Sequence, residues 1–160
     1  MVSAAGVRHC PDRVQGLVEM QPPQTAGELQ QFLCAVKWMR QSIPEYNRLT
    51  AGLYAVLEQA MKAAGSRKKA KLAKFPLDQI GWGDQQLTDL AAVKAALLKM
   101  VPLAHPSPTA ETCLYTDSSQ DSWGAVATQL DPGKVQLLQE QQHHRPLAFL
   151  SGRFVGASSR

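Results

Sequence analysis

The feature that most constrains the fold of this chain is a change of hydrophobic pattern at a proline-rich stretch. Pro102, Pro106 and Pro108 separate a first part, in which apolar residues recur at helical spacing, from a last part of short β-rich runs. The order predicts an α+β protein in which helices come first, with a boundary near residue 104. The 160 residues suffice for one domain or two small ones.

About three helices are predicted before the prolines. Thr25 and Glu28 have the spacing of a capping box, and the apolar stripe that follows stops before Pro44. A second helix is expected over about 45–64, with apolar residues at every fourth position and Gly65 as its stop. A third is expected over about 84–100, with Leu87 on its apolar side. Residues 1–24, with three prolines, are expected to be irregular.

Three strands are predicted after the prolines. The runs 111–116, 122–129 and 145–151 are rich in β-formers, and Asp-Pro-Gly at 131–133 is turn chemistry. The polar stretch between the second and third runs, including His143 and His144, is expected to be a long hairpin connection. The three strands are therefore expected to pair as an antiparallel meander.

The composition restricts the class of partner and the compartment. The net charge of +4 and the pI near 9.1 permit a polyanionic partner without demanding one. Three widely separated cysteines indicate reduced thiols in an intracellular protein, and no spacing suits a zinc site. No run approaches the ~18 apolar residues of a membrane span, and the N-terminus lacks a signal-peptide core. We expect a cytoplasmic or nuclear protein with no membrane contact.

Two clusters are candidate sites, each with a second interpretation. Asp117 ends the first predicted strand beside Ser118 and Ser119, so it is either a metal ligand or a turn residue with capping serines. A basic run lies between the second and third helices. It is a solvated loop, a phosphate-binding surface or a nuclear import signal. Its members are Arg67, Lys68, Lys69, Lys71 and Lys74.

Three tryptophans complete the candidates. Trp38, Trp82 and Trp123 are expected to be core or domain-contact residues rather than base-stacking platforms. His143 and His144 have no partners at metal-ligand spacing.

Four stretches, in order, resemble a known family. They are P-P-Q-T-A-G-E-L-Q-Q-F-L with the following S-I-P-E-Y, then I-G-W-G-D-Q-Q-L-T-D-L, then V-P-L-A-H-P, and finally L-Y-T-D-S-S with W-G-A-V-A-T-Q and R-P-L-A-F-L-S. The set is similar to the reverse transcriptase polyprotein of gypsy-type LTR retrotransposons, from just after the polymerase palm into the ribonuclease H domain. The resemblance implies a helical thumb or connection segment over 1–104 and the N-terminal part of an RNase H-like domain over 105–160.

The sequence also departs from that family. Cys34 stands where glycine is usual, Trp38-Met39 where two tyrosines are common, and the basic stretch around Lys69 resembles an insertion. There is no Asp-Asp pair, so the polymerase Y-x-D-D motif is missing, and D-S-S at 117 does not continue as a retroviral-type protease motif.

The resemblance implies Mg²⁺ chemistry on an RNA–DNA hybrid, with Asp117 as the first of several carboxylates around two ions. On this interpretation Ser118 and Ser119 offer hydroxyls and amides to the RNA backbone, and the alternative is that they cap the turn. Downstream of it the sequence offers only Asp121, Asp131 and Glu140, none on a helix after the third strand. The sequence therefore predicts an incomplete site in a truncated RNase H-like meander that does not cleave hybrids alone.

Three hypotheses follow from the resemblance. The chain is a fragment of a reverse transcriptase/ribonuclease H that holds the hybrid within the rest of the polyprotein, a non-catalytic nucleic-acid-binding module, or an inert or protein-interaction remnant. Because the partial sheet buries little and leaves an open edge, residues 105–160 are expected to be less protected than the helical part.

Overall fold

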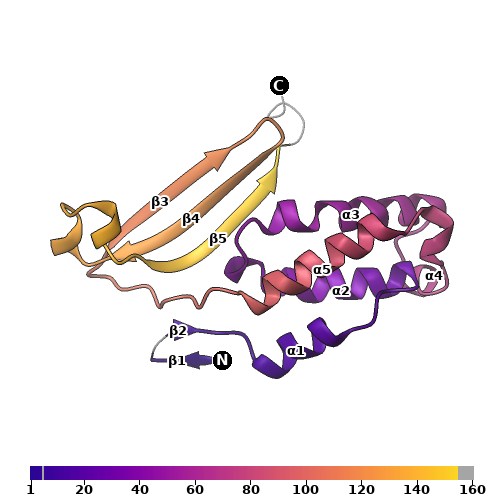
Figure 1. The fold of residues 1–160 in the computed structure, drawn as a ribbon, viewed down its shortest axis with the longest axis horizontal. Coiled ribbons are helices and arrows are strands. Elements are labelled where there is room, and N and C mark those ends of the chain that lie inside the picture. The colour runs from indigo at the N-terminus through magenta and orange to yellow at the C-terminus, as the bar shows by residue number, and fades with distance from the viewer. Residues whose placement is uncertain (5, 155–160) are drawn as a thin grey trace. The chain divides into compact units, whose positions relative to one another are not determined.

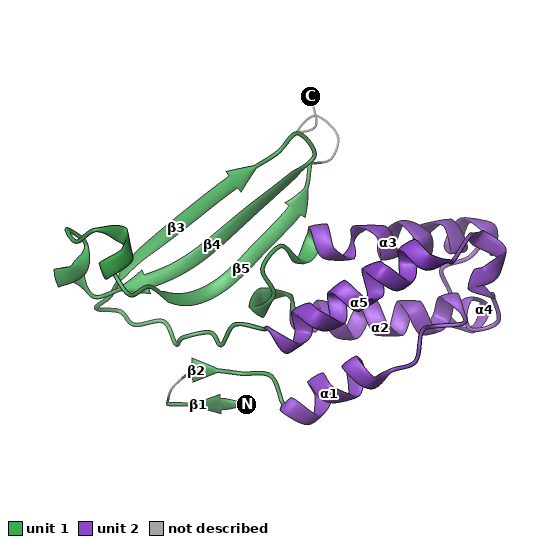
Figure 2. Ribbon diagram, viewed as in Figure 1, with its two compact units in different colours: residues 1–10, 40–47, 100–160 green, residues 11–39, 48–99 purple. Residues whose placement is uncertain are grey.

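The structure is a computed structural model that describes residues 1–4 and 6–154. The chain divides into two compact units (Figure 2). The helical unit comprises residues 11–39 and 48–99, and the sheet unit comprises residues 1–10, 40–47 and 100–160. Helices and a three-stranded antiparallel sheet are both present, so the predicted α+β class is confirmed (Figure 1).

The helical unit is built on the three predicted helices and two that were not predicted. They are α1 (Pro11–Glu19), α2 (Ala26–Trp38), α3 (Tyr46–Ala63, its first two residues counted with the sheet unit), α4 (Lys69–Leu72) and α5 (Asp84–Leu98). A short 3₁₀ turn, η2, covers Leu77–Ile80. The apolar stripes of the three long helices supply the core: Leu29, Phe32, Leu33, Val36, Leu53, Leu57, Leu90, Val93 and Leu97.

Local signals fix where the long helices begin and end. The Thr25 hydroxyl accepts the Glu28 N–H at 3.3 Å, and the Glu28 carboxylate accepts the Thr25 N–H at 3.2 Å, so the predicted capping box is confirmed. Gly65 follows α3 with a φ of +59°, the left-handed conformation that ends helices. Leu87, expected on the apolar side of α5, is instead 39% exposed.

The expectation of an irregular N-terminus was wrong. In the sheet unit, β1 (Val2–Ser3) and β2 (Gly6–Val7) form a small antiparallel pair, and Val7 exchanges backbone hydrogen bonds of 2.7 and 3.1 Å with Leu103. Gly6 has a φ of +127°, and a Cβ there would lie 2.3 Å from the Leu103 carbonyl oxygen, so the contact requires glycine. Leu103, which pairs with β2, lies far away in the sequence, so no local pattern around residues 1–10 could predict the pairing.

The main sheet is the predicted meander. Strands β3 (Glu111–Ser118), β4 (Ser122–Leu130) and β5 (Arg145–Arg153) pair antiparallel in that order, with one irregularity of register after Ala127. The predicted long connection leads from β4 to β5 and holds two 3₁₀ turns, η3 (Pro132–Lys134) and η4 (Gln139–Gln141). Within the described residues β3 pairs only with β4, so it is an edge strand.

The two faces of this sheet differ, because side chains alternate along each strand. Tyr115, Asp117 and Ser151 share one face by register. There the Ser151 hydroxyl accepts the Asn47 N–H at 3.0 Å, which ties β5 to the segment 40–47. Segment 40–47 contains a 3₁₀ turn, η1 (Arg40–Ser42), and buries Ile43 and Tyr46.

The opposite face carries large apolar side chains in water. Leu114 is 63% exposed, and Trp123 and Leu150 are each 39% exposed. Trp123 lies over Gly152, where a Cβ would come within 2.7 Å of the indole ring.

Trp38, in the helical unit, is 87% exposed, so the expectation of a core position was wrong for this residue.

The described residues contain no helix that is both long and apolar enough to cross a membrane.

Candidate nucleic-acid interface

The residues predicted to form sites fall into two groups, one in each unit. Asp117, Ser118 and Ser119 lie at the β3–β4 turn of the sheet unit. The five basic residues from Arg67 to Lys74 lie on and around α4 in the helical unit. Each group is brought together by the local fold of its own unit.

The β3–β4 turn holds its polar side chains in local hydrogen bonds. Asp117 pairs in register with Gly124, its side chain is exposed, and its Oδ1 accepts the Ser118 N–H at 2.8 Å. The Ser119 N–H donates to the Ser122 carbonyl at 2.8 Å, and the two serine hydroxyls lie 3.0 Å apart. These bonds are what a turn-forming aspartate and a capping serine make.

The carboxylates downstream of Asp117 form no metal-binding group of three with it in the described residues. Asp131 is engaged by Arg145 at 3.2 Å and by Lys134 at 3.8 Å. Glu140 belongs to η4, in the β4–β5 connection. Residues 1–4 and 6–154 contain no group of three or more His, Cys, Asp or Glu side chains placed to hold a metal ion. Since Mg²⁺ needs several oxygen ligands, these residues do not by themselves fit a two-ion site.

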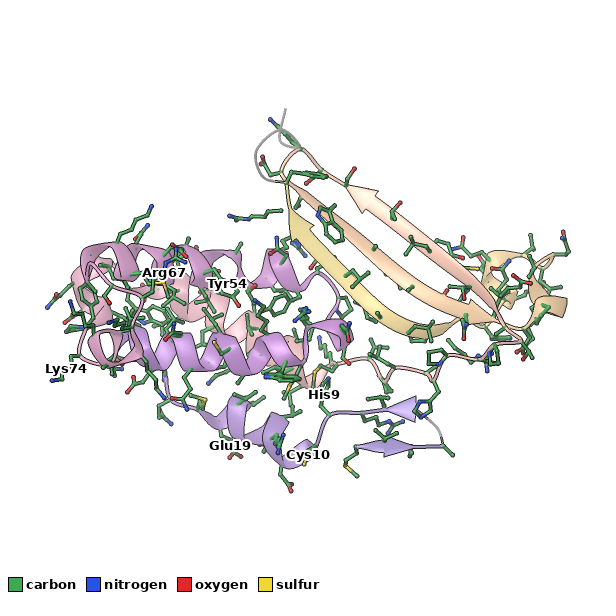
Figure 3. All side chains as sticks on the ribbon, turned by 180° about the vertical axis from the view of Figure 1, so that it is seen from behind. His9, Cys10, Glu19, Tyr54, Arg67 and Lys74 are labelled. Carbon is green, nitrogen blue, oxygen red and sulfur yellow. The ribbon has the colours of Figure 1, made fainter. Side chains whose placement is uncertain are left out.

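The basic segment is partly helical, with a short helix inside the solvated connection between α3 and η2. Lys69–Leu72 form α4, and the Leu72 side chain is 0% exposed. Arg67, Lys68, Lys69, Lys71 and Lys74 are all exposed around it. Figure 3 labels the first and last of them, Arg67 and Lys74. A helix is usually indicated by apolar residues that recur every three or four positions. Within this run Leu72 is the one large apolar residue, so the run contains little indication of α4.

Backbone contacts join the basic segment to the start of α2. The Ala26 N–H donates to the Phe75 carbonyl at 2.9 Å, and the Leu77 N–H donates to the Gln24 carbonyl at 2.9 Å. Gly27 lets α4 approach closely, because a Cβ on Gly27 would lie 2.8 Å from Ala73 Cα. The buried Leu72 side chain and the backbone that follows it therefore both fix the segment in place.

Two histidines have defined surroundings that the sequence did not reveal. His144 Nδ1 lies 2.9 Å from the Thr128 hydroxyl, and its Nε2 lies 3.1 Å from the Tyr115 hydroxyl and 2.7 Å from the Gln142 side-chain oxygen. This cluster fastens the long connection to β3 and β4. In the sheet unit, burial and, to a smaller extent, the N-terminal ammonium lower the pKa of His9 from its usual value.

Comparison with known proteins identifies similar sequences. Residues 82–160 match the sequence model of the RNase H-like domain found in reverse transcriptase. The chain is 30% identical over 158 residues to the retrovirus-related Pol polyprotein from transposon opus of Drosophila melanogaster, covering 94% of this chain and 14% of that protein. It is 29% identical over 159 residues to the Gag-Pol polyprotein of walleye dermal sarcoma virus, covering 99% of this chain and 8% of that protein.

Solved structures agree on the fold. The foamy viral protease-reverse transcriptase in complex with RNA/DNA hybrid superposes with a TM-score of 0.72 at 15% identity, covering 99% of this chain and 18% of that one. The same enzyme in complex with dsDNA gives a TM-score of 0.69 at 15% identity, over 96% of this chain and 27% of that one. The chain spans only a small part of each relative. Residues 82–160 therefore match the RNase H-like domain found in reverse transcriptase, and the chain as a whole is similar to retrotransposon and retroviral Pol polyproteins.

Proposed function

We propose that the chain is a nucleic-acid-binding segment of a gypsy-type retrotransposon reverse transcriptase/ribonuclease H, which holds an RNA–DNA hybrid within its polyprotein. The observation that carries the proposal is the similarity of fold over 99% of the chain to a reverse transcriptase whose structure contains an RNA/DNA hybrid. The net charge of +4 is compatible with a polyanionic partner.

On this proposal the chain's described residues bind the hybrid without cleaving it. Asp117 is a single exposed carboxylate with one oxygen on a neighbouring backbone N–H, and a lone carboxylate leaves Mg²⁺ with most of its water. Asp117 contributes to hydrolysis only where further carboxylates join it from outside residues 1–4 and 6–154. The compartment that suits such a binder is the cytoplasm or the nucleus.

A protein-interaction role is the second candidate. The observation that favours it is the apolar sheet face of Leu114, Trp123 and Leu150, which lies exposed in the sheet unit. In this candidate the partner is another part of the polyprotein, and binding to nucleic acid is weak or absent.

The test is binding to a labelled RNA–DNA hybrid and to duplex DNA of the same sequence, across a salt series with Mg²⁺ present and cleavage recorded in the same samples. We expect binding that weakens steeply with salt, without cleavage. Cleavage that is lost in Asp117→Asn would overturn the non-catalytic part of the proposal. Absence of binding at low salt would overturn the nucleic-acid role and favour the protein-interaction candidate.

A further inference from the structure

The segment between α3 and η2 concentrates positive charge. From Gln59 to Leu77 the sequence has six basic residues and no acidic one. Like charges so close together repel one another unless a counter-charge is present. A surface of this kind lowers its electrostatic energy when it meets a polyanion.

The lysines of this segment have no internal counter-charge in the part of the chain that the structure describes. No hydrogen bond or ion pair of the side chains of Lys68, Lys69, Lys71 or Lys74 occurs there. Arg67 differs, because its guanidinium lies 3.1 and 3.3 Å from the two carboxylate oxygens of Glu58 on α3. Four ammonium groups are therefore available to an external partner, while the guanidinium is already engaged.

The backbone that carries these lysines is anchored rather than free. Leu72 is buried between them in sequence, and the close approach of Ala73 to Gly27 fixes the end of α4 against α2. The bond from the Ala26 N–H to the Phe75 carbonyl holds the chain just beyond Lys74. An anchored backbone loses less conformational entropy on binding than a flexible loop does, so more of the electrostatic energy appears as affinity.

We propose that residues 67–74, the α4 basic segment, form a preformed surface that binds the sugar–phosphate backbone of a nucleic-acid duplex independently of base sequence. Lysine ammonium groups act as point charges toward phosphate, whereas bidentate reading of a base needs a free guanidinium or amide. The segment from Arg67 to Lys74 contains no aromatic side chain on which a base could stack. The inference rests on the proposed nucleic-acid binding and assigns a surface to it.

The experiment compares three proteins on the same duplexes. One is the unaltered chain, one carries Lys68→Gln, Lys69→Gln, Lys71→Gln and Lys74→Gln, and one carries arginine at the same four positions. Because all four side chains are exposed, circular dichroism is expected to show the same helix content in each. Hybrid and duplex DNA of two unrelated base sequences are titrated at several salt concentrations.

The glutamine variant is expected to bind both sequences about tenfold or more weakly near 0.1 M salt, and its salt slope should fall by about 0.9 for each lysine that meets a phosphate. The arginine variant should bind like the unaltered chain, because it keeps the charge. Removal of two other exposed charges of the helical unit, by Arg13→Gln with Lys99→Gln, should change affinity less than threefold.

Each outcome separates this inference from the function on which it rests. If the unaltered chain binds neither duplex, the proposed function and the inference both fail. If it binds and the glutamine variant binds equally well, the function stands and the α4 basic segment is not its surface. A loss confined to one base sequence would overturn the backbone-only mode of contact.

Discussion

The two units of this chain differ in how completely they bury their own apolar side chains. In the helical unit the stripes of α2, α3 and α5 meet, and Leu29, Leu53 and Leu97 are each no more than 1% exposed. In the sheet unit one face packs against segment 40–47, while Leu114, Trp123 and Leu150 on the other face remain in water. The long helices of the helical unit bury their apolar stripes, whereas one apolar face of the described sheet stays exposed.

The difference shows what each kind of element needs. A helix buries a narrow stripe, so three helices of ordinary length can cover one another. An antiparallel sheet has two faces, and a face that is permanently exposed to solvent normally carries polar residues. The apolar residues on the second face of β3, β4 and β5 therefore have the pattern expected of a sheet that is covered on both faces.

The largest expected effect comes from removing the same side chain in the two units. Leu29→Ala should lower the free energy of unfolding by about 2–5 kcal/mol, because Leu29 is 0% exposed and its loss leaves a cavity. Leu114→Ala, at a side chain 63% exposed, should stay within about 0.5 kcal/mol. Denaturant unfolding followed by circular dichroism measures both, and equal losses would remove the contrast between the units.

Amide hydrogen exchange compares the units without any substitution. Amides of α2, α3 and α5 are expected to exchange about tenfold or more slowly than those of β3, a difference of about 1.4 kcal/mol in opening free energy. The physical reasons are the complete core of the helical unit and the unpaired edge of β3 in the described sheet. Equal protection in both units would show that the sheet face is already covered in the free protein.

Much of the fold could be predicted because its signals are local. The capping box at Thr25 and Glu28, the stop at Gly65 and the alternation in the three strands each act within a few residues. The parts that were missed depend on distant partners. Strand β2 is ordered by Leu103, and α4 by its packing against Gly27, neither of which leaves a periodic pattern.

The candidate site was less predictable than the fold for the same reason. The sequence places Asp117 and the lysines of 67–74, but which other groups approach a side chain depends on register and packing. The Arg67–Glu58 pair and the contacts of His144 with Tyr115 and Thr128 join residues whose proximity follows only from the folded arrangement. The role of Asp117 and of the lysines stays a prediction that the binding experiments test.

Gly27 tests how closely the helical unit is packed at the α4 basic segment. Gly27→Ala would place a Cβ 2.8 Å from Ala73 Cα, a backbone atom that has little room to move, and should cost about 1–3 kcal/mol of stability. Gly16→Ala in α1 is the matched control, since nothing lies within 4 Å of its Cβ position. There the same change should stabilise by about 0.5–1 kcal/mol, because alanine is the better helix former.

Thermal and denaturant unfolding of these two variants give the result. If Gly27→Ala behaved like Gly16→Ala, α4 would not be held against α2, and the α4 basic segment would lose its anchored backbone. The lysines would then lie on a flexible chain that loses conformational entropy on binding, so the affinity for the same duplex should be lower.

The smallest expected effect concerns the start of α2. Thr25→Ala removes the hydroxyl that accepts the Glu28 N–H and should lower the free energy of unfolding by about 1 kcal/mol. Thr88→Ala is the control, because the Thr88 hydroxyl donates only to the Asp84 carbonyl within α5 and caps no helix end. A loss at Thr25 that appears in helix unfolding while β3 amides exchange at an unchanged rate would show that the two units open independently. A loss shared by both would mean that the helical unit also sets the stability of the sheet.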